Sequence, residues 1–228
     1  MGTTLTPSTD IIEALNYAFI EPARNLTKSR GKNIHRYSSV KMGKRVSVET
    51  TLEYDACFHF DFTKKIKRFC SQPVRYSYSL NGEKHTYVPD FLVEFENGEF
   101  ILYEVKTNVA SESKLFEVEF EAKKLAAEQL GIYLELITQS QIREAHLLNN
   151  FKLLHRYASR KDLTIIKKIV LGILEEYGTV SIDLLIYQTG FSKQKLMPAL
   201  CNLLSKCILD ADLYLPITSA TEVELTYA

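Results

Sequence analysis

Alternating apolar and polar residues in the middle of the chain predict a β-sheet. Residues 74–80 and 84–95 alternate in this way, and Asn81-Gly82 between them supplies the positive φ angles of a two-residue hairpin turn. A second Asn-Gly pair, at 97–98, separates the second run from a third strand at 100–107. We therefore expect three consecutive antiparallel strands.

Helical spacing follows the third strand. Residues 113–130 predict an amphipathic helix whose apolar face consists of Leu115, Val118, Ala122, Leu125 and Ala126. The apolar run 132–138 predicts a short buried strand. A strand, helix, strand succession of this length takes a right-handed crossover, which sets the last strand parallel to a strand of the meander. The sheet is therefore predicted to be mixed. Further helices are expected at 10–19, 49–60 and 139–158.

The last third of the chain has a different pattern. Helices are predicted at 163–177, 181–188 and 192–206, and the glycine-containing turn between the last two matches the spacing of a helix-turn-helix. Apolar runs at 208–214 and 223–227 then predict two strands of a wing. The expected succession is therefore helical, with a small sheet at its end.

These elements divide into two expected domains. The polar stretch 159–162 predicts a boundary between a mixed α/β domain at 1–158 and a small winged-helix-like domain at 159–228. A length of 228 residues agrees with one main domain and a small appendage. A composition of 46% apolar and 25% charged residues excludes a disordered chain.

The sequence also predicts where the protein resides. No apolar run approaches the ~20 residues of a membrane helix, and the amino terminus lacks a basic segment ahead of an apolar one. The four cysteines show no CxxC spacing. We therefore expect a cytoplasmic protein with neither a membrane span nor a disulfide framework.

The formal net charge of zero hides an uneven distribution. Between Pro22 and Val48 the chain carries basic residues and no acidic ones, whereas residues 51–150 hold 11 basic and 16 acidic side chains. A positive arm suits the binding of DNA phosphates, and concentrated carboxylates suit the binding of cations. A solvated surface stretch has the same charge pattern, so charge alone does not decide. The candidate DNA-binding residues of this arm are Arg24, Lys28, Arg30, Lys32, Arg36, Lys41, Lys44 and Arg45.

The segment TYVPDFLVEFENGEFILYEVKT, residues 86–107, holds the most informative charged residues. Glu104 and Lys106 are two apart on a predicted strand and project from one face, and antiparallel pairing can bring Asp90 beside Glu104. Two carboxylates and a backbone carbonyl, such as that of Val105, form a partial cage for Mg²⁺, and Lys106 is placed to hold a water molecule. The alternative is an exposed ion pair on an edge strand. Apolar neighbours predict central strands instead, where converging charges are costly unless they are paired or bound to metal.

These residues resemble a known signature. Asp90 followed by Glu104-x-Lys106 is similar to the PD-(D/E)xK motif of metal-dependent nucleases, and the wider stretch resembles TnsA, the endonuclease subunit of heteromeric bacterial transposases. The resemblance rests on ETTLEYDACFHFDF, SQPVRYSY and YVPDFLVEF…YEVKT, within residues 20–150. It implies a restriction-endonuclease-like fold for the first domain and Mg²⁺ as cofactor, with Mn²⁺ able to substitute. Asp90, Glu104 and Lys106 would then be catalytic.

The resemblance also implies a third carboxylate. Glu53 matches a helical glutamate that completes the metal site in the family, and it would act as both a catalytic and a metal-binding residue. Gln72 begins a strand that lines the site and is a weaker candidate for contact with DNA. From the residues alone, Glu49 lies one helical turn from Glu53 and could equally be the ligand or a capping residue.

The function implied by the resemblance is DNA cleavage during cut-and-paste transposition. A TnsA-like enzyme would hydrolyse the 5′ ends of the transposon in the bacterial cytoplasm, on the strand that its partner does not cut. The implied partners are DNA, the transposase subunit TnsB and the ATP-dependent regulator TnsC. Lys193 and Lys195, at the start of the predicted recognition helix, are placed to reach phosphates. A helix-turn-helix that docks on protein is an equal alternative.

Two other interpretations compete with this one. The first is a restriction or repair endonuclease of the same superfamily, for which cleavage without a partner would be evidence. The second is a non-catalytic DNA-binding or scaffold protein, in which Asp90, Glu104 and Lys106 form a structural ion-pair network. Of the three interpretations, the sequence favours the metal-dependent endonuclease that resembles TnsA.

Overall fold

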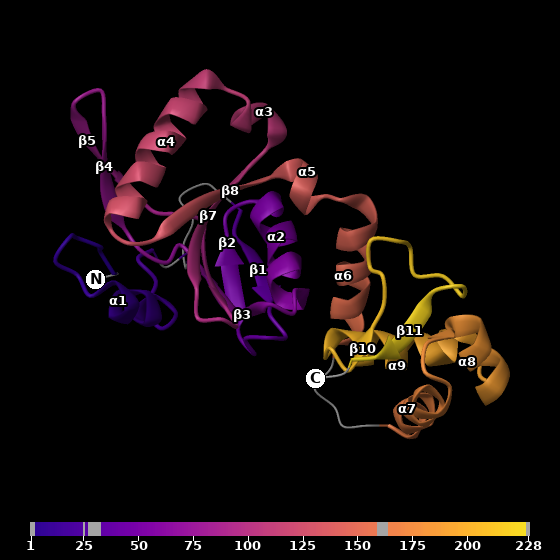
Figure 1. The fold of residues 1–228 in the computed structure, drawn as a ribbon. Coiled ribbons are helices and arrows are strands. Elements are labelled where there is room, and N and C mark those ends of the chain that lie inside the picture. Colours follow the sequence, from indigo (N-terminus) through magenta and orange to yellow (C-terminus); the bar gives the residue numbers. More distant parts are fainter. Residues whose placement is uncertain (1–2, 25, 27–32, 159–163, 227–228) are drawn as a thin grey trace. The chain divides into compact units, whose positions relative to one another are not determined.

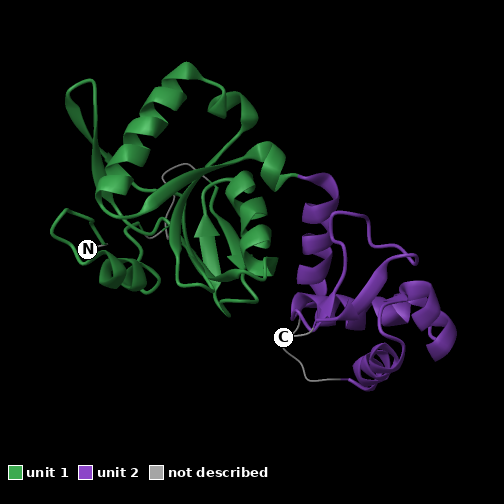
Figure 2. Ribbon diagram, viewed as in Figure 1, with its two compact units in different colours: residues 1–143 green, residues 144–228 purple. Residues whose placement is uncertain are grey.

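The computed structural model describes residues 3–24, 26, 33–158 and 164–226. The chain divides into two compact units, residues 1–143 and 144–228 (Figure 2). This division comes earlier than the predicted boundary at 158/159, and the polar stretch predicted there, residues 159–162, lies outside the described residues. Helix α6 (Ala145–Tyr157) belongs to the second unit because it packs against helix α9 (Lys193–Ser205).

The first unit is built around a four-stranded sheet in the order β3-β6-β7-β8 (Figure 1). Its strands are β3 (Ile66–Ser71), β6 (Phe91–Phe95), β7 (Phe100–Lys106) and β8 (Tyr133–Thr138). Strand β6 is antiparallel to both β3 and β7, whereas β7 and β8 run parallel. The predicted mixed sheet is therefore confirmed, with the parallel pair joined by a helical crossover as expected.

The predicted three-stranded meander is wrong in one respect. Strands β4 (Tyr76–Leu80) and β5 (Glu83–Tyr87) form a separate two-stranded sheet, and positive φ angles at Asn81 (51°) and Gly82 (80°) make the expected turn. The long strand predicted at 84–95 is interrupted after Tyr87, because Pro89 has no amide N–H to continue a ladder. Strand β3, which the sequence pattern did not predict, takes the place beside β6.

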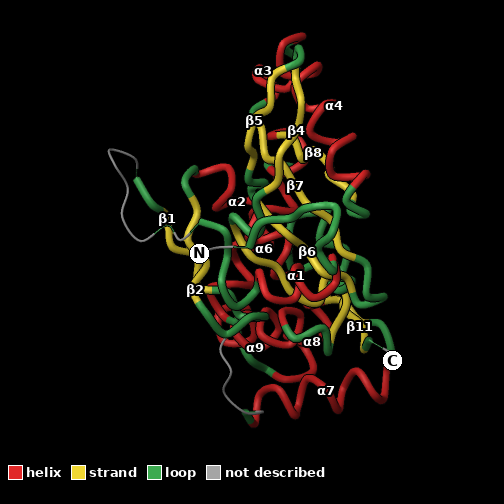
Figure 3. Tube along the Cα trace, turned by 90° about the vertical axis from the view of Figure 1, so that its left-hand side faces the viewer, coloured by secondary structure: helices red, strands yellow, loops and turns green. Residues whose placement is uncertain are grey.

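Helices cover both faces of the central sheet (Figures 1 and 3). On one face Phe60 of helix α2 (Thr51–Phe62) contacts the rings of Phe69, Phe91 and Tyr103, with centroids 5.0–5.9 Å apart. On the other face, Leu92, Leu102 and Leu134 share a core with Ala127 of helix α4 (Lys114–Gln129) and with helix α1 (Ile11–Ala18). Because successive side chains of a strand alternate between faces, Glu104 and Lys106 lie on the same side as Leu102, toward α4.

Helix α4 turns an unexpected side toward the core. Its buried residues are Lys123 and Ala127, whereas Leu115, Val118 and Leu125 are 84%, 59% and 51% exposed. The large apolar side chains of the predicted face are therefore exposed, whereas Ala122 and Ala126 of the same face pack against the core. The helix packs on tyrosines of β4 and β5. The Lys123 ammonium forms cation–π contacts with the rings of Tyr78 and Tyr87.

The basic arm contains a hairpin. Strands β1 (His35–Ser38) and β2 (Arg45–Val48) pair in antiparallel fashion. Asp61 of α2 holds the connection between them: Oδ1 accepts hydrogen bonds from the Ser39 hydroxyl (2.6 Å) and the Lys41 amide (2.9 Å). Its Oδ2 accepts hydrogen bonds from the Tyr37 hydroxyl (2.9 Å) and the Val40 amide (2.8 Å). One buried carboxylate therefore organises the whole turn.

We expect Asp61→Asn to destabilise the first unit by about 2–4 kcal/mol, because the new amide nitrogen faces donors that it cannot accept from. Tyr37→Phe is the matched control, since it removes one of the four donors and should cost about 1 kcal/mol. Urea unfolding followed by far-UV circular dichroism measures both. Equal stability of the two variants would show that the hairpin does not depend on the carboxylate.

The two short helices of the first unit flank the crossover. They are α3 (Asn108–Ser111), directly after β7, and α5 (Gln139–Ile142), directly after β8. The single helix predicted at 139–158 is therefore two helices, α5 and α6. They are separated at Arg143, whose guanidinium donates a hydrogen bond to Asp55 of α2 at 3.0 Å.

The second unit combines helices with a small sheet. Its remaining helices and strands are α7 (Ile165–Tyr177), β9 (Val180–Ser181), α8 (Ile182–Thr189), β10 (Leu209–Asp210) and β11 (Glu222–Leu225). Strand β11 lies between β10 and β9 and is antiparallel to both. Helix α8 ends at Gly190 in the left-handed conformation (φ 65°), and α9 starts three residues later, as the glycine-containing turn predicts. None of the helices in the described ranges has the length and apolar character of a membrane span.

Candidate active site

The register of β6 and β7 brings Asp90 and Glu104 together. Phe91 pairs with Tyr103, so the next positions outward, Asp90 and Glu104, face each other at the end of the ladder. Asp90 Oδ2 accepts a hydrogen bond from the Val105 amide at 2.9 Å. The predicted convergence of these two carboxylates is therefore found in the structure.

Glu104 is buried and is held by two donors. Its Oε1 lies 2.5 Å from Lys106 Nζ, and its Oε2 accepts a hydrogen bond from the Tyr87 hydroxyl. Burial alone would lower the pKa of Lys106, but the negative charges of Glu104, Asp90 and Glu53 outweigh it and raise that pKa. Lys106 is therefore a firmly charged ammonium beside the two carboxylates.

Asp90 is the carboxylate whose charge the site disfavours most. Burial, followed by the nearby charges of Glu104 and Glu53, raises its pKa well above the usual range, against the opposing effects of the Val105 hydrogen bond and Lys106. Tyr87 is affected similarly, because burial and the Glu104 charge raise its pKa well above normal and keep its hydroxyl a donor. Perturbed groups that cluster in this way are typical of functional sites.

Glu53 lies near Asp90 and Glu104, but its carboxylate takes part in capping the N-terminus of α2. Oε1 accepts a hydrogen bond from the Thr50 hydroxyl (2.8 Å) and Oε2 from the Glu49 amide (3.0 Å), while the Thr50 hydroxyl accepts one from the Glu53 amide (3.1 Å). Burial is the main cause that raises the pKa of Glu53. The alternative ligand, Glu49, forms an ion pair with Arg24 at 2.7 Å. The assignment of Glu53 as a metal ligand stays a prediction.

The donor set suits a hard divalent cation without forming a complete cage. Within the described ranges, no group of three or more His, Cys, Asp or Glu side chains converges closely enough to hold a metal ion. Asp90 and Glu104 nevertheless supply oxygen ligands of the kind Mg²⁺ prefers, and Mg²⁺ usually keeps several waters. The crowding that raises the pKa of Asp90 is also what a bound cation relieves. The residues therefore fit a two-carboxylate site.

Gln72 borders this site through its backbone. Its amide donates a hydrogen bond to the Asp90 carbonyl at 2.9 Å, and its side chain is buried. Its φ of 50° lies in the left-handed region, which non-glycine residues seldom adopt outside turns and functional sites. The predicted contact of Gln72 with DNA stays a prediction.

Some basic side chains of the predicted arm donate hydrogen bonds within the protein, and others are exposed to solvent. Lys28, Arg30 and Lys32 lie outside the described residues. The Lys41 ammonium donates hydrogen bonds to the carbonyls of Thr63 (2.8 Å) and Ile66, and Lys44 donates one to the Phe19 carbonyl (2.8 Å). Arg36 and Arg45 are exposed on the outer face of the β1–β2 hairpin, opposite buried Tyr37 and Val46. Of the described arm, these two arginines are the best placed for contact with a phosphate backbone.

Sequence reasoning did not identify three residues that surround Glu104. These residues are Tyr87, Glu119 and Lys123. Lys123 is buried, forms an ion pair with Glu119 at 2.8 Å and lies 4.4 Å from the centroid of the Tyr87 ring. A lysine on the predicted polar side of an amphipathic helix carries no signal of this burial.

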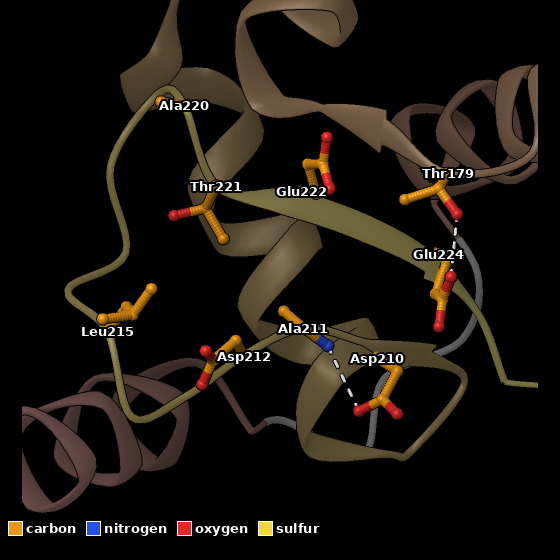
Figure 4. Close-up of a pocket in the computed structure, with 9 residues that line it drawn as sticks. All are labelled: Thr179, Asp210, Ala211, Asp212, Leu215, Ala220, Thr221, Glu222 and Glu224. Atoms are coloured by element: carbon orange, nitrogen blue, oxygen red, sulfur yellow. Dashed lines mark hydrogen bonds between the residues drawn. The ribbon is translucent and has the colours of Figure 1, made fainter.

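The second unit holds the other predicted cations and an acidic hollow. Lys193 and Lys195 are exposed at the start of α9, and Lys195 Nζ lies 4.0 Å from the centroid of the Phe191 ring. Figure 4 shows a separate hollow around β10 and β11, lined by Asp210, Asp212, Glu222 and Glu224 together with Thr179, Ala211, Leu215, Ala220 and Thr221. The two features have opposite charge, so they suit different ligands.

Comparison with known proteins supports the nuclease interpretation. Residues 63–139 match a family model described as TnsA-like endonuclease N terminal. The matched segment runs from the start of β3 through β8 and therefore contains Gln72, Asp90, Glu104 and Lys106. No curated protein matches the chain. This match confirms the resemblance inferred from the sequence: residues 63–139 are similar to the N-terminal domain of TnsA-like endonucleases.

Proposed function

We propose that the protein is a divalent-metal-dependent DNA endonuclease that cleaves the 5′ ends of a transposon, in partnership with a TnsB-like transposase and a TnsC-like ATP-dependent regulator. The observation that carries the proposal is the pairing of Asp90, Glu104 and Lys106 at one end of the β6–β7 ladder, inside the segment that matches the TnsA-like model. Metal dependence, transposition and the two partners follow from the family and from the ligand types.

Each residue of the site would have a separate task. Asp90 and Glu104 would bind the cation directly with the Val105 carbonyl, and Glu53 would add negative charge from the start of α2. The cation supplies Lewis-acid stabilisation of charge on the phosphate and lowers the pKa of a bound water. Lys106, whose ammonium lies 2.5 Å from Glu104 Oε1, would hold and orient that water.

The exposed arginines of the first unit would bind DNA through its backbone. We expect Arg36→Gln with Arg45→Gln to weaken DNA binding, and each lost phosphate contact should reduce the slope of log K against log salt by about 0.9. Lys84→Gln is the matched control, since Lys84 is exposed on the β4–β5 hairpin. Fluorescence anisotropy with duplex DNA at several salt concentrations measures the slope. An unchanged slope would remove this hairpin from the DNA interface.

The second unit is proposed to be a winged-helix module. After α6, the order helix, strand, helix, helix, strand, strand, with the glycine turn between α8 and α9, supports that assignment. Lys193 and Lys195 at the start of α9 favour contact with phosphates. The acidic hollow beside β10 and β11 is unsuited to DNA, so contact with a protein partner remains the second candidate for this unit.

The experiment that tests the function is cleavage of a plasmid that carries transposon ends. The full chain is incubated with the partner transposase and regulator in Mg²⁺, in Mn²⁺ and in excess chelator, and the cut strand is mapped at each end. We expect 5′-end cleavage in both metals and none with chelator. Sequence-specific cutting without partners would favour a restriction or repair nuclease. Absence of cutting under all conditions, with intact DNA binding, would favour a non-catalytic protein.

A further inference from the structure

The carboxylate of Glu104 is restrained by two different kinds of contact. Its Oε1 contacts the mobile end of a lysine side chain, Lys106 Nζ at 2.5 Å. Its Oε2 accepts the hydroxyl hydrogen of Tyr87, a rigid group with few rotatable bonds. Lys106 is one-third exposed, whereas Tyr87 is buried. The lysine can therefore move away from Glu104 far more easily than the tyrosine can.

The ring of Tyr87 is fixed from several sides. Lys123 Nζ lies 4.4 Å from its centroid, and the Tyr76 ring meets it edge to face with centroids 5.3 Å apart. Lys123 is itself held by Glu119 at 2.8 Å, and Glu119 also accepts a hydrogen bond from Tyr78 at 2.9 Å. Lys123 therefore links Glu119 to the rings of Tyr78 and Tyr87. The direction of the Tyr87 hydroxyl is therefore set by α4.

From this geometry we propose that Tyr87 is a positioning residue for the divalent cation: it retains Oε2 of Glu104 so that Oε1 is the oxygen offered to the metal. The inference rests on the proposed function, because it requires a cation at the Asp90–Glu104 pair. A ligand that is already oriented by an outer hydrogen bond loses less freedom when it binds. Departure of Lys106 from Oε1 would at the same time release the ammonium that is proposed to hold the attacking water.

The test compares two conservative variants of the full-length protein, Tyr87→Phe and Tyr76→Phe. Both remove one hydroxyl from a buried ring, and both keep the ring that packs beneath α4. The hydroxyl of Tyr76 donates a hydrogen bond to the Lys123 carbonyl at 3.2 Å, whereas that of Tyr87 donates to Glu104. The pair therefore separates loss of a buried hydroxyl from loss of the contact with the carboxylate.

Two readouts are needed. Isothermal calorimetry measures the affinity for Mg²⁺ and Mn²⁺ with and without duplex DNA, independently of any cleavage. Cleavage as a function of Mg²⁺ concentration gives the half-saturating concentration and the rate at saturation. We expect Tyr87→Phe to weaken metal affinity by about 10-fold or more. The half-saturating Mg²⁺ concentration should rise in parallel, while the rate at saturating Mg²⁺ stays within about threefold of wild type. Tyr76→Phe should leave both quantities unchanged.

The outcomes distinguish this inference from the function on which it rests. Wild-type binding and cleavage together with unchanged metal affinity in Tyr87→Phe would overturn the positioning role and leave the nuclease proposal standing. Equal losses in Tyr87→Phe and Tyr76→Phe would also overturn it, since the effect would then be one of packing. Absence of metal binding by wild type, with and without DNA, would remove the metal-dependent function and the positioning role together.

Discussion

Asp90→Asn is expected to abolish DNA cleavage while the protein becomes at least as stable as wild type in the absence of metal. The activity should fall by about 10³-fold or more, because a metal ligand contributes several kcal/mol of transition-state stabilisation and each 1.36 kcal/mol is tenfold in rate. The asparagine oxygen can still accept the hydrogen bond from the Val105 amide, so the end of the β6–β7 ladder keeps its contact. Loss of activity would therefore not come from loss of fold.

The gain in stability has a defined dependence on pH. Burial and the charges of Glu104 and Glu53 raise the pKa of Asp90 in the folded state, so the ionised carboxylate opposes folding above its unfolded pKa. As the pH falls through the raised pKa toward the unfolded value, wild type takes up a proton and recovers that stability. The melting temperature of Asp90→Asn should therefore exceed that of wild type at neutral pH, and the difference should shrink in acid.

Thermal denaturation of both proteins in chelator, across pH 4 to pH 8 in roughly one-unit steps, measures this difference. Added Mg²⁺ should raise the melting temperature of wild type and leave that of Asp90→Asn unchanged, since only a site that binds metal is stabilised by it. Asp55→Asn is a useful control, because Asp55 is a buried acid of α2 that pairs with Arg143 outside the candidate site. It should lose stability and keep cleavage activity. A cleaving Asp90→Asn protein would remove Asp90 from the site.

The second large effect is expected for Lys106→Met, which removes the cation beside Glu104. Glu104 is only 4% exposed, so its charge would be left buried with the neutral Tyr87 hydroxyl in place of the contact with a cation. We expect a loss of about 3 kcal/mol, the lower end of the cost of breaking a buried ion pair, because Lys106 itself is partly exposed. Cleavage should also fall by about 10²–10⁴-fold, the range for loss of a group that handles a proton in the reaction.

A double variant separates these two effects. Glu104→Gln combined with Lys106→Met replaces the ion pair by neutral groups of similar size, and the glutamine oxygen can still accept from Tyr87. Its stability should return to within about 1 kcal/mol of wild type, because such replacements are often neutral. Its cleavage activity should stay absent. Recovery of activity together with stability would show that the pair serves the fold alone.

Local signals account for the parts of the fold that were predicted correctly. Asn81-Gly82 specifies its turn by itself, since both residues readily adopt positive φ. Helix α4 is followed by the apolar run of β8, which implies that β8 pairs in parallel with β7. The reason is that a strand, helix, strand unit forms a right-handed crossover connection. Glycine turns likewise predicted the succession of helices α7, α8 and α9, although β9 was not predicted.

Long-range pairing accounts for the errors. Strand β3 is short and carries Lys67 and Arg68, which are stabilised by Glu94 on the neighbouring strand. Glu94 is 26–27 residues away from these two residues in the sequence, so no local pattern predicts the strand. The side of α4 that is buried is also a tertiary property, because only the packed tyrosines make burial of Lys123 favourable.

The candidate site divides in the same way. The sequence by itself determined that Asp90, Glu104 and Lys106 share one end of a strand pair, because spacing along strands and the resemblance to TnsA depend on local residues alone. Only the tertiary structure decided which groups contact the carboxylate oxygens of the site. Tyr87 and Lys106 contact those of Glu104, and the Thr50 hydroxyl and the Glu49 amide donate hydrogen bonds to those of Glu53. These contacts join separate elements, and their energies depend on burial and distance, which no periodicity in a sequence encodes.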